Sequence, residues 1–449
     1  MAHLVCVVRG YPSIVGPGLE LARRLAADGH RVTFLGAPDS GEAAEHRGLA
    51  FAPLEPDRHG SFLKTDRSGA LGRWFRLRRR RDHAVRLLGV DGFAAQLRDL
   101  RPDLVLIDGE MHAHILVVLA ADLPLALLNP FASIWRVPGL PPTHYLVRPG
   151  VGWRGSRIGI ALAWRALGVR KTIRRLRLLW RDAGCDRESV LRHLADELGV
   201  DTRRELDTGQ WPIPFTYRRL PVLSLHAREF EFGHTPPSHV HYVGPMVPDP
   251  KVAEEADAGL DEVLARCADV DGAESSRDVL IYAGFGASLT TDPAFLRRLV
   301  VVVETRPDWH LVVSLGGRSD EILGSLPARV HVFPWVPQRR VLETAAVCVT
   351  HGGINTIDEC VLAEVPMLVY CGFETDMAGN TARVEHHGIG IAGDRRRDTT
   401  ATIRDHLDRL LTDPSFGTHI GRLAGSYRAY REDGVAERVV ASWLDGRRP

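Results

Sequence analysis

The sequence has almost no net charge and lacks the features that mark several specialised protein classes. Its formal net charge is +1 over 449 residues, so overall electrostatics give no argument for nucleic acid or acidic partners. No apolar run approaches the roughly 18 residues of a membrane-spanning helix. The apolar start His3–Val8 is too short for a signal peptide and lacks a basic flank, so we expect none. Only three of the 57 basic residues are lysine, which we attribute to a GC-rich genome.

Cysteine is also scarce, and the six cysteines show no paired spacing. Most lie inside apolar runs, which is typical of buried free thiols in a reducing compartment. We therefore expect a cytoplasmic protein. A hydrophobic content of 45% and a charged content of 25% are ordinary for a globular protein, and the length allows two or three domains.

The most informative stretch runs from Trp335 to Ala382. Within it, Val347–Thr350 is a short β-branched run typical of a buried parallel strand. It leads directly into His351-Gly352-Gly353, and an amphipathic helix then begins. Open α/β sheets hold anionic phosphates where a strand ends at glycines and a helix starts, because free N–H groups and the positive end of the helix dipole point at the ligand.

Polar side chains around this turn suit a nucleotide sugar. His351 adds a donor, Asn355 and Thr356 add neutral donors, and Glu359 adds an acceptor suited to sugar hydroxyls. The next strand leads to the acidic loop 374–376, which we place at the same carboxyl edge of the sheet. A phosphate cradle beside carboxylates therefore predicts a nucleotide-sugar site.

The whole stretch resembles the donor-binding segment of family 1 glycosyltransferases of the macrolide and natural-product type, which have the GT-B fold. It contains W-x-P-Q, H-x-G-x-N-[ST]-x-x-E, V-P and D-x-x-x-N in the family's order and near its spacing. The resemblance implies that Trp335 stacks on the base and that the Val336 backbone hydrogen-bonds the edge of the base. It also implies that Gln338 and Glu359 hold the ribose and that Asp376 binds sugar hydroxyls. His351, Asn355 and Thr356 are then expected to bind the diphosphate where the helix starts at Gly353.

Two further positions bear on the donor. The family usually has Gln after the acid at 376, whereas this chain has Met377. One contact to the sugar is therefore lost, and the motif does not determine the identity of the donor sugar. Earlier, a strand at 278–283 enters a turn that resembles the family's F-G-S/T turn. The resemblance assigns Gly286 and Ser288 to the donor phosphates.

The N-terminal segment indicates the start of a doubly wound sheet. Leu4–Val8 is the expected first strand, Pro17 is expected to open a helix, and Arg31–Leu35 follows as the next strand. The text P-x-L-x-L-A-x-x-L-x-x-x-G-H-x-V-T-F in this segment resembles the N-terminal region of the same glycosyltransferases.

The usual catalytic base of that family is missing. The family has a His three residues before the helix proline, where this chain has Ile14 beside Ser13, and no His lies between His3 and His30. An aliphatic side chain cannot take a proton. The base therefore comes from elsewhere, or the acceptor is already acidic, or the protein binds a nucleotide sugar with slow or activator-dependent turnover.

Three candidates for a relocated base follow the strand expected at 103–107. Asp108 ends the family-like text P-D-L-V-L-x-D, where the family's second dyad residue is found, and Glu110 and His112 come directly after it. All three would lie at the carboxyl end of a strand, where sheets of this kind hold ligands. An N-cap role for Asp108 remains an equal alternative, and structural roles for Glu110 and His112 also stay open.

Alternating strand and helix patterns in both halves favour an α/β protein of GT-B architecture, with two facing Rossmann-like doubly wound domains and an interdomain cleft. We predict an acceptor-binding domain at 1–245, a linker at 246–271, a nucleotide-sugar domain at 272–425 and a C-terminal helix at 426–449 that returns to the first domain. The expected partners are a nucleotide-sugar donor and a small acceptor, without nucleic acid, in a monomer or homodimer.

Two basic amphipathic stretches, 62–88 and 153–181, have two open interpretations. They are solvated surface helices, or they form a peripheral membrane or anionic-acceptor surface. In the resembling family this domain forms the acceptor pocket. The motif Pro138–Pro142 resembles carotenoid glucosyltransferases, which favours a bulky apolar acceptor.

The function that this pattern predicts is inverting, metal-independent transfer of a sugar from a UDP or dTDP sugar to a hydrophobic natural product. We expect no metal, since no clustered Asp pair stands out, and no cofactor besides the nucleoside diphosphate sugar as co-substrate. The alternatives are a nucleotide-sugar epimerase of the same fold, and a nucleotide-sugar-binding protein with weak or activator-dependent catalysis.

Overall fold

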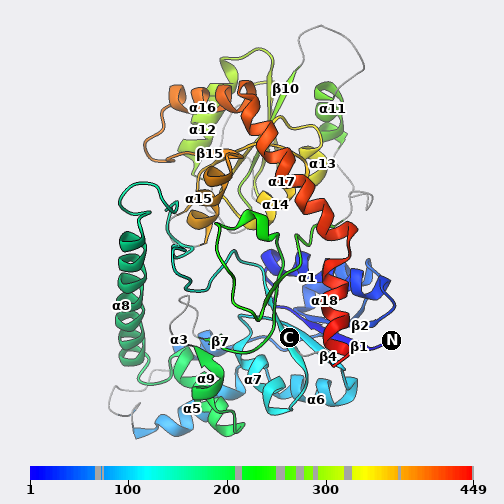
Figure 1. Ribbon diagram of the computed structural model, residues 1–449, viewed down its shortest axis with the longest axis vertical. Helices are drawn as coiled ribbons and strands as arrows, with labels where there is room; N and C mark the ends of the chain where they lie inside the picture. Colours follow the sequence, from blue (N-terminus) through cyan, green and yellow to red (C-terminus); the bar gives the residue numbers. More distant parts are fainter. Residues whose placement is uncertain are drawn as a thin grey trace.

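Two parallel β-sheets, one in each half of the molecule, organise the chain (Figure 1). The computed structural model describes residues 1–65, 72, 75–207, 215–248, 258–268, 278–286, 292–317, 326–372 and 376–446. The sheet of the N-terminal half has the order β3-β2-β1-β4-β5-β8-β9, and the sheet of the C-terminal half has the order β12-β11-β10-β13-β14-β15. In each sheet the first strand lies between the second and the fourth, which is the doubly wound arrangement expected from the sequence.

The N-terminal sheet is parallel throughout. Most of its strand residues are buried, because helices cover both faces of a sheet of this kind. β3 was not predicted, since four residues that end in proline carry little strand pattern. The strands are β1 (His3–Val7), β2 (Arg31–Gly36), β3 (Ala50–Pro53), β4 (Leu104–Asp108), β5 (Leu125–Asn129), β8 (Val222–Ser224) and β9 (Val240–Tyr242).

The first helix differs from its prediction. α1 spans Pro12–Ala27, with Pro17 inside it, so the expectation that Pro17 opens the helix is wrong. Pro12 supplies the start instead, because a proline in the first turn loses no hydrogen bond. The other N-terminal helices are α2 (Gly41–Glu45), α3 (His59–Thr65), α5 (Leu77–Arg86), α6 (Asp91–Leu100), α7 (His112–Ala120), α8 (Arg157–Arg181), α9 (Arg187–Glu197) and α10 (Thr202–Glu205).

The C-terminal sheet is also parallel. The predicted strand at 347–350 is confirmed residue for residue. Its strands are β10 (Val279–Gly284), β11 (Trp309–Ser314), β12 (Val330–Phe333), β13 (Val347–Thr350), β14 (Met367–Val369) and β15 (Gly390–Ala392). Its helices are α11 (Ala258–Cys267), α12 (Pro293–Glu304), α13 (Gln338–Leu342), α14 (Ile354–Leu362), α15 (Met377–His387), α16 (Thr400–Thr412) and α17 (Pro414–Glu432).

Two segments join the halves. After β8 the chain crosses upward, and Ala227 and Phe230 become part of the hydrophobic core of the C-terminal half. At the end of the chain, α18 (Val435–Leu444) returns to the N-terminal half, as Figure 1 shows in red. There Arg24 of α1 holds Glu437 through two hydrogen bonds of 2.8 and 2.9 Å. The predicted boundary at 426 falls inside α17.

Candidate functional site

The turn between β13 and α14 has the geometry of an anion cradle. Gly353 is the N-cap of α14, with φ −65° and ψ 135°, and in the described part of the chain no side chain caps the helix. The first-turn N–H groups therefore remain available to a ligand. Gly352 has φ +87°, and a Cβ there would lie 3.0 Å from Thr381 and Val369, so only glycine fits this turn.

The His351 ring lies between Gly353, in the turn after β13, and Gly286, in the turn after β10. A Cβ on Gly353 would come within 2.7 Å of its Nε2, and one on Gly286, which has φ +67°, within 3.1 Å of its Cε1. Burial lowers the pKa of His351 to about 4, although a hydrogen bond to the Gly284 backbone opposes this. The ring is therefore neutral at pH 7 and offers a hydrogen bond instead of a positive charge.

The residues predicted to hold the ribose are in contact. Gln338 donates from Nε2 to Glu359 Oε2 at 2.5 Å and to Thr356 Oγ1 at 3.3 Å. Its Oε1 accepts from the Tyr282 hydroxyl at 3.0 Å. Tyr282, which the sequence reasoning missed, thereby fixes the orientation of the Gln338 amide.

The two residues predicted to bind the base, Trp335 and Val336, precede this group. Trp335 is 62% exposed, and its ring lies against Gly317, where a Cβ would be 3.1 Å from Nε1. Val336 packs partly against the C-terminal core. An exposed indole beside a half-buried backbone segment can receive a flat ring by stacking.

Asp376 is tied to the phosphate turn through a residue that the sequence reasoning did not assign. Asn380, fully buried in α15, donates to Asp376 Oδ2 at 3.0 Å and to the Gly352 carbonyl at 3.1 Å. The Asn that ends the D-x-x-x-N motif was the sequence signal that could have identified Asn380. Burial raises the pKa of Asp376, while its hydrogen bond from Asn380 lowers it. Met377 is half-buried, and Ser288 and residues 373–375 lie outside the described residues.

In the N-terminal half, Asp108 closes β4 and is 2% exposed. Its Oδ1 accepts from the Glu110 N–H at 3.0 Å. Burial raises the pKa of Asp108, and hydrogen bonds and the Arg9 charge oppose the rise. The N-cap of α7 is Met111, so Asp108 stabilises the turn before that helix.

Glu110 is the more accessible carboxylate, with a side chain 27% exposed. Arg9, at the end of β1, lies 3.5 Å from its carboxylate and donates to its carbonyl at 3.3 Å. Burial and the charge of Asp108 raise the pKa of Glu110, Arg9 lowers it, and Asp376 raises it further. Glu110 therefore lies within electrostatic range of the predicted sugar-binding acid of the other half. Arg9 was not predicted, because one basic residue after a strand carries no pattern.

The remaining catalytic candidates have different surroundings. His112 is 2% exposed, its Nδ1 lies 3.4 Å from the Tyr217 hydroxyl, and burial lowers its pKa to about 3. Ser13 is exposed, and its carbonyl accepts from Asn355 Nδ2 at 3.1 Å. Ile14 is buried in the N-terminal core.

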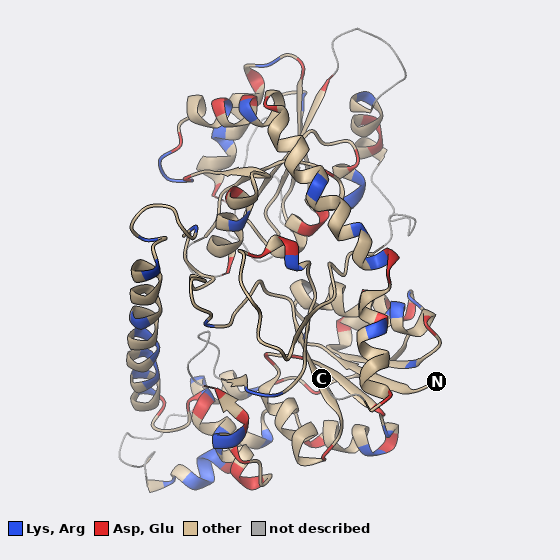
Figure 2. Cartoon of the chain, in the orientation of Figure 1, with Lys and Arg blue, Asp and Glu red and all other residues tan. Residues whose placement is uncertain are grey.

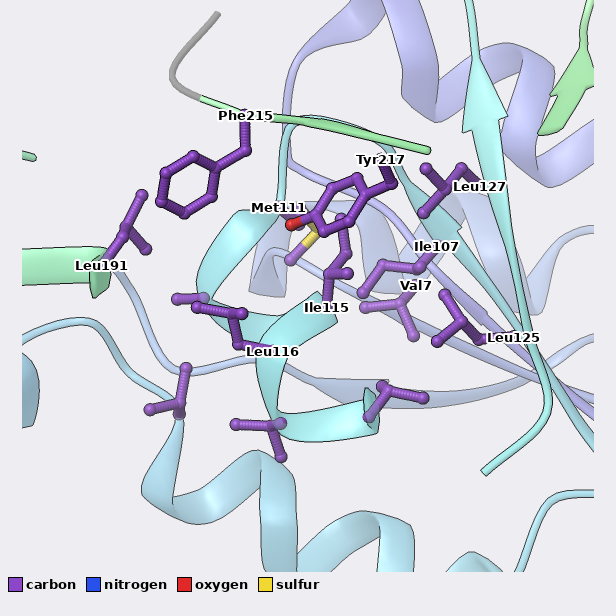
Figure 3. Close-up of a cluster of buried hydrophobic side chains, with 14 of the residues drawn as sticks. Val7, Ile107, Met111, Ile115, Leu116, Leu125, Leu127, Leu191, Phe215 and Tyr217 are labelled. Carbon is purple, nitrogen blue, oxygen red and sulfur yellow. The ribbon is translucent and has the colours of Figure 1, made fainter. Parts of the chain in front are cut away.

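A cavity opens beside Asp108 and Glu110. Its volume is about 30 Å³, so a bulky ligand would need side chains to move. Three of its lining residues, Phe215, Tyr217 and Leu127, belong to the buried hydrophobic cluster that Figure 3 shows. The wall is largely aromatic and aliphatic, with the two carboxylates at one end; it includes Asn129, Phe131, Ile134, Trp135, Phe215 and Tyr217.

The C-terminal half matches a known family. Residues 299–434 match the family described as erythromycin biosynthesis protein CIII-like, C-terminal domain. The chain is 29% identical over 145 residues to an oleandomycin glycosyltransferase of Streptomyces antibioticus, covering 32% of this chain. It is 33% identical over 190 residues to an ecdysteroid UDP-glucosyltransferase of Spodoptera littoralis nuclear polyhedrosis virus, covering 41% of this chain. The chain spans about a third of the length of each, 34% in both cases.

Longer matches extend over both halves. A zeaxanthin glucosyltransferase of Pseudescherichia vulneris is 26% identical over 436 residues, which are 94% of this chain and 92% of that protein. The structure of a kitacinnamycin glycotransferase superposes with a TM-score of 0.70 at 22% identity, covering 99% of this chain and 98% of the other. The glycosyltransferase VinC in complex with dTDP superposes with a TM-score of 0.59 at 18% identity, covering 97% and 100%.

Proposed function

We infer that this chain belongs to the family 1 glycosyltransferases of the natural-product type, with the GT-B fold, and we propose that it moves a sugar from a nucleoside diphosphate sugar to a small apolar acceptor. The observation that carries this proposal is the uncapped start of α14, tied by Asn380 to Asp376. Together they offer donors for a diphosphate and an acceptor for sugar hydroxyls.

The donor is UDP or dTDP sugar in this proposal. The Gln338–Glu359 pair suits the ribose, and Trp335 suits the base. VinC was solved with dTDP, which supports a diphosphate nucleotide without deciding between the two. Because the amide that the family usually has after the sugar-binding acid is Met377 here, the sugar makes one hydrogen bond fewer.

The acceptor enters from the N-terminal half. The aromatic wall of the cavity, with Phe131, Trp135 and Phe215, suits an apolar ring system. This wall favours transfer to an acceptor over epimerisation, which needs carboxylates facing the sugar but no hydrophobic acceptor surface.

Glu110 acts as the general base in the proposed reaction. Its raised pKa brings it closer to neutral pH, where a base works best, and it is more accessible than Asp108. The acceptor oxygen forms a bond to the anomeric carbon while the bond to the diphosphate oxygen breaks, and the acceptor proton passes to Glu110. One displacement from the opposite face inverts the anomeric centre.

Charge on the leaving diphosphate is stabilised by the N–H groups of α14, with His351 as a neutral partner. We propose that no metal and no further cofactor is required. The one group of described acidic and His side chains close enough to hold a cation, Asp82, His193 and Glu197, joins α5 to α9. Transfer that continues unchanged in excess EDTA would agree with this.

The test is calorimetric titration of the protein with UDP and dTDP, followed by product analysis with UDP-glucose, dTDP-glucose and a panel of polyketide and phenolic acceptors. We expect micromolar nucleotide binding and a product of inverted configuration. Absence of nucleotide binding would refute the donor site. Binding without product under any acceptor would favour the second candidate, a binding protein with activator-dependent catalysis, which the buried Ile14 supports.

A further inference from the structure

Helix α8 stands apart from both sheets, at the left margin of the molecule in Figure 1. It is 25 residues long, or about 37 Å at 1.5 Å per residue. Its inner face is short: Ile160, Trp164 and Leu167 form a small cluster of their own, and Trp164 Nε1 donates to the Leu140 carbonyl at 2.7 Å. From Gly168 to Arg177 every residue except Lys171 is exposed.

The outer face of α8 is apolar along its whole length. Its exposed apolar residues follow one another at intervals of three, four or seven, which places them within an arc of roughly 60° at 100° per residue. Their exposed fractions run from 43% to 74%. We call this set the α8 stripe: Ile158, Leu162, Val169, Ile173, Leu176 and Trp180.

All charged residues of α8 are basic. Residues 151–181 contain no Asp or Glu, while α8 carries seven Arg and one Lys, which Figure 2 shows as blue segments among tan along the helix. The cations flank the stripe on both sides. Arg80 and Arg81 of α5 donate to the carbonyls of residues 182–184, so the exposed Arg78 and Arg79 extend the basic surface beyond the end of α8.

We propose that the α8 stripe inserts into the interface of a bilayer that contains anionic lipids, with α8 lying in the membrane plane. An apolar face bordered by cations is the pattern of helices that lie in the headgroup region. Exposed Trp153, just before α8, and Trp180 at its other end suit the amphipathic interface. In the described part of the chain no helix is long and apolar enough to cross a bilayer.

The same surface does not suit a protein partner of ordinary composition. An interface between copies would bring the cations of two α8 helices together without acidic residues of α8 to pair them. Anionic headgroups supply that negative charge. The inference does not depend on the proposed transfer reaction.

Co-flotation with vesicles tests the proposal. The probes are vesicles of phosphatidylcholine and phosphatidylglycerol at 3:1 and vesicles of phosphatidylcholine alone. We expect the wild-type protein to float with the first and not the second, and to be released by high salt. Ile173→Glu should reduce the bound fraction roughly tenfold or more, because it places a carboxylate in the stripe. Val301→Glu on α12 is the matched control, since Val301 is 46% exposed and Ile173 43%, and it should bind like wild type.

Several results would overturn the proposal. Equal binding to neutral vesicles, equal binding by Ile173→Glu, or an equal loss with Val301→Glu would each contradict it. Light scattering after gel filtration covers the remaining case: a wild-type dimer that Ile173→Glu dissociates, with no flotation, would assign the stripe to an interface between copies. Circular dichroism of both variants verifies that α8 is intact.

Discussion

Asn355 donates its side-chain amide to the main-chain oxygen of Ser13 across the two halves, at 3.1 Å. The Ser13 carbonyl would normally accept from the N–H four residues later, but that residue is Pro17, which has none. Pro17 thus leaves the Ser13 carbonyl without its usual helical donor. Asn355, at the start of the helix that forms the predicted phosphate cradle, donates to this carbonyl instead. The predicted diphosphate site and the first N-terminal helix are therefore joined by one hydrogen bond.

Replacing this amide should weaken nucleotide binding in a graded way. Asn355→Ala removes one neutral donor, which is worth about 1 kcal/mol and a loss of severalfold in affinity. Asn355→Asp should lose tenfold or more, roughly, because a carboxylate would lie beside the diphosphate. Calorimetric titration with UDP measures both. Equal affinities for the two variants would argue against an anion at the start of α14.

Glu110→Gln should lower the transfer rate by about a hundredfold or more, since general-base catalysis contributes on that scale. Nucleotide affinity should stay unchanged, because Glu110 belongs to the other half. Asp108→Ala is the comparison: it should lower protein stability more than Glu110→Gln, since it removes the buried acceptor of the Glu110 N–H. A Glu110→Gln enzyme of normal rate would return the role of base to Asp108.

Ile14→His should not restore a catalytic base. Ile14 is 2% exposed in the N-terminal core, so the new imidazole would be buried and neutral. We expect a loss of about 2 kcal/mol or more in unfolding free energy, measured by urea denaturation, without faster transfer. A gain in rate with a hydroxyl acceptor would mean that α1 can rotate this position into the cleft.

The buried pair Glu231–Arg383 should be the most sensitive contact between the halves. Arg383 donates to Glu231 Oε2 from Nη2 at 2.6 Å and from Nε at 2.9 Å, and both side chains are about 1% exposed. Burial would raise the pKa of Glu231, but Arg383 and His226 outweigh it and hold the pKa well below its usual range.

Arg383→Met should therefore cost about 3–5 kcal/mol of unfolding free energy, because it leaves a buried carboxylate unpaired. The double variant Arg383→Met with Glu231→Gln should recover part of that loss. Urea denaturation at pH 7 measures both variants. A double variant less stable than either single one would indicate that packing, and not charge, dominates this contact.

Stability should fall as the pH drops from about 6.5 to 4. Burial lowers the pKa of His351, His114 and His387 to about 4 and that of His112 to about 3. The unfolded chain binds protons on these residues in that range and the folded chain does not, so the unfolding free energy rises with pH there. Denaturation midpoints at pH 7.5 and 5 test this, and His114→Phe should flatten the slope.

Local pattern was enough to predict the strand and turn on which the proposed donor site is built, because these residues are close in sequence. β13 and the turn at 351–353 follow from the apolar run and the glycines, and the contact of Gln338 with Glu359 agrees with the family resemblance. Features that depend on distant parts of the chain were not predictable in this way. Arg9 reaches Glu110 across 101 residues, and Arg383 reaches Glu231 across 152. The start of α1 was misplaced because two prolines both fit a helix start locally.

The excursion of residues 226–232 into the C-terminal core has a consequence for protein engineering. Ala227 and Phe230 pack there although both neighbouring strands belong to the other sheet. A chimaera that exchanges the C-terminal half at the linker near residue 246 would place residues 226–232 against the core of another protein. Recombination between relatives should therefore transfer residues 226–232 together with the C-terminal half. Otherwise, the side chains that pack against these residues need to be redesigned.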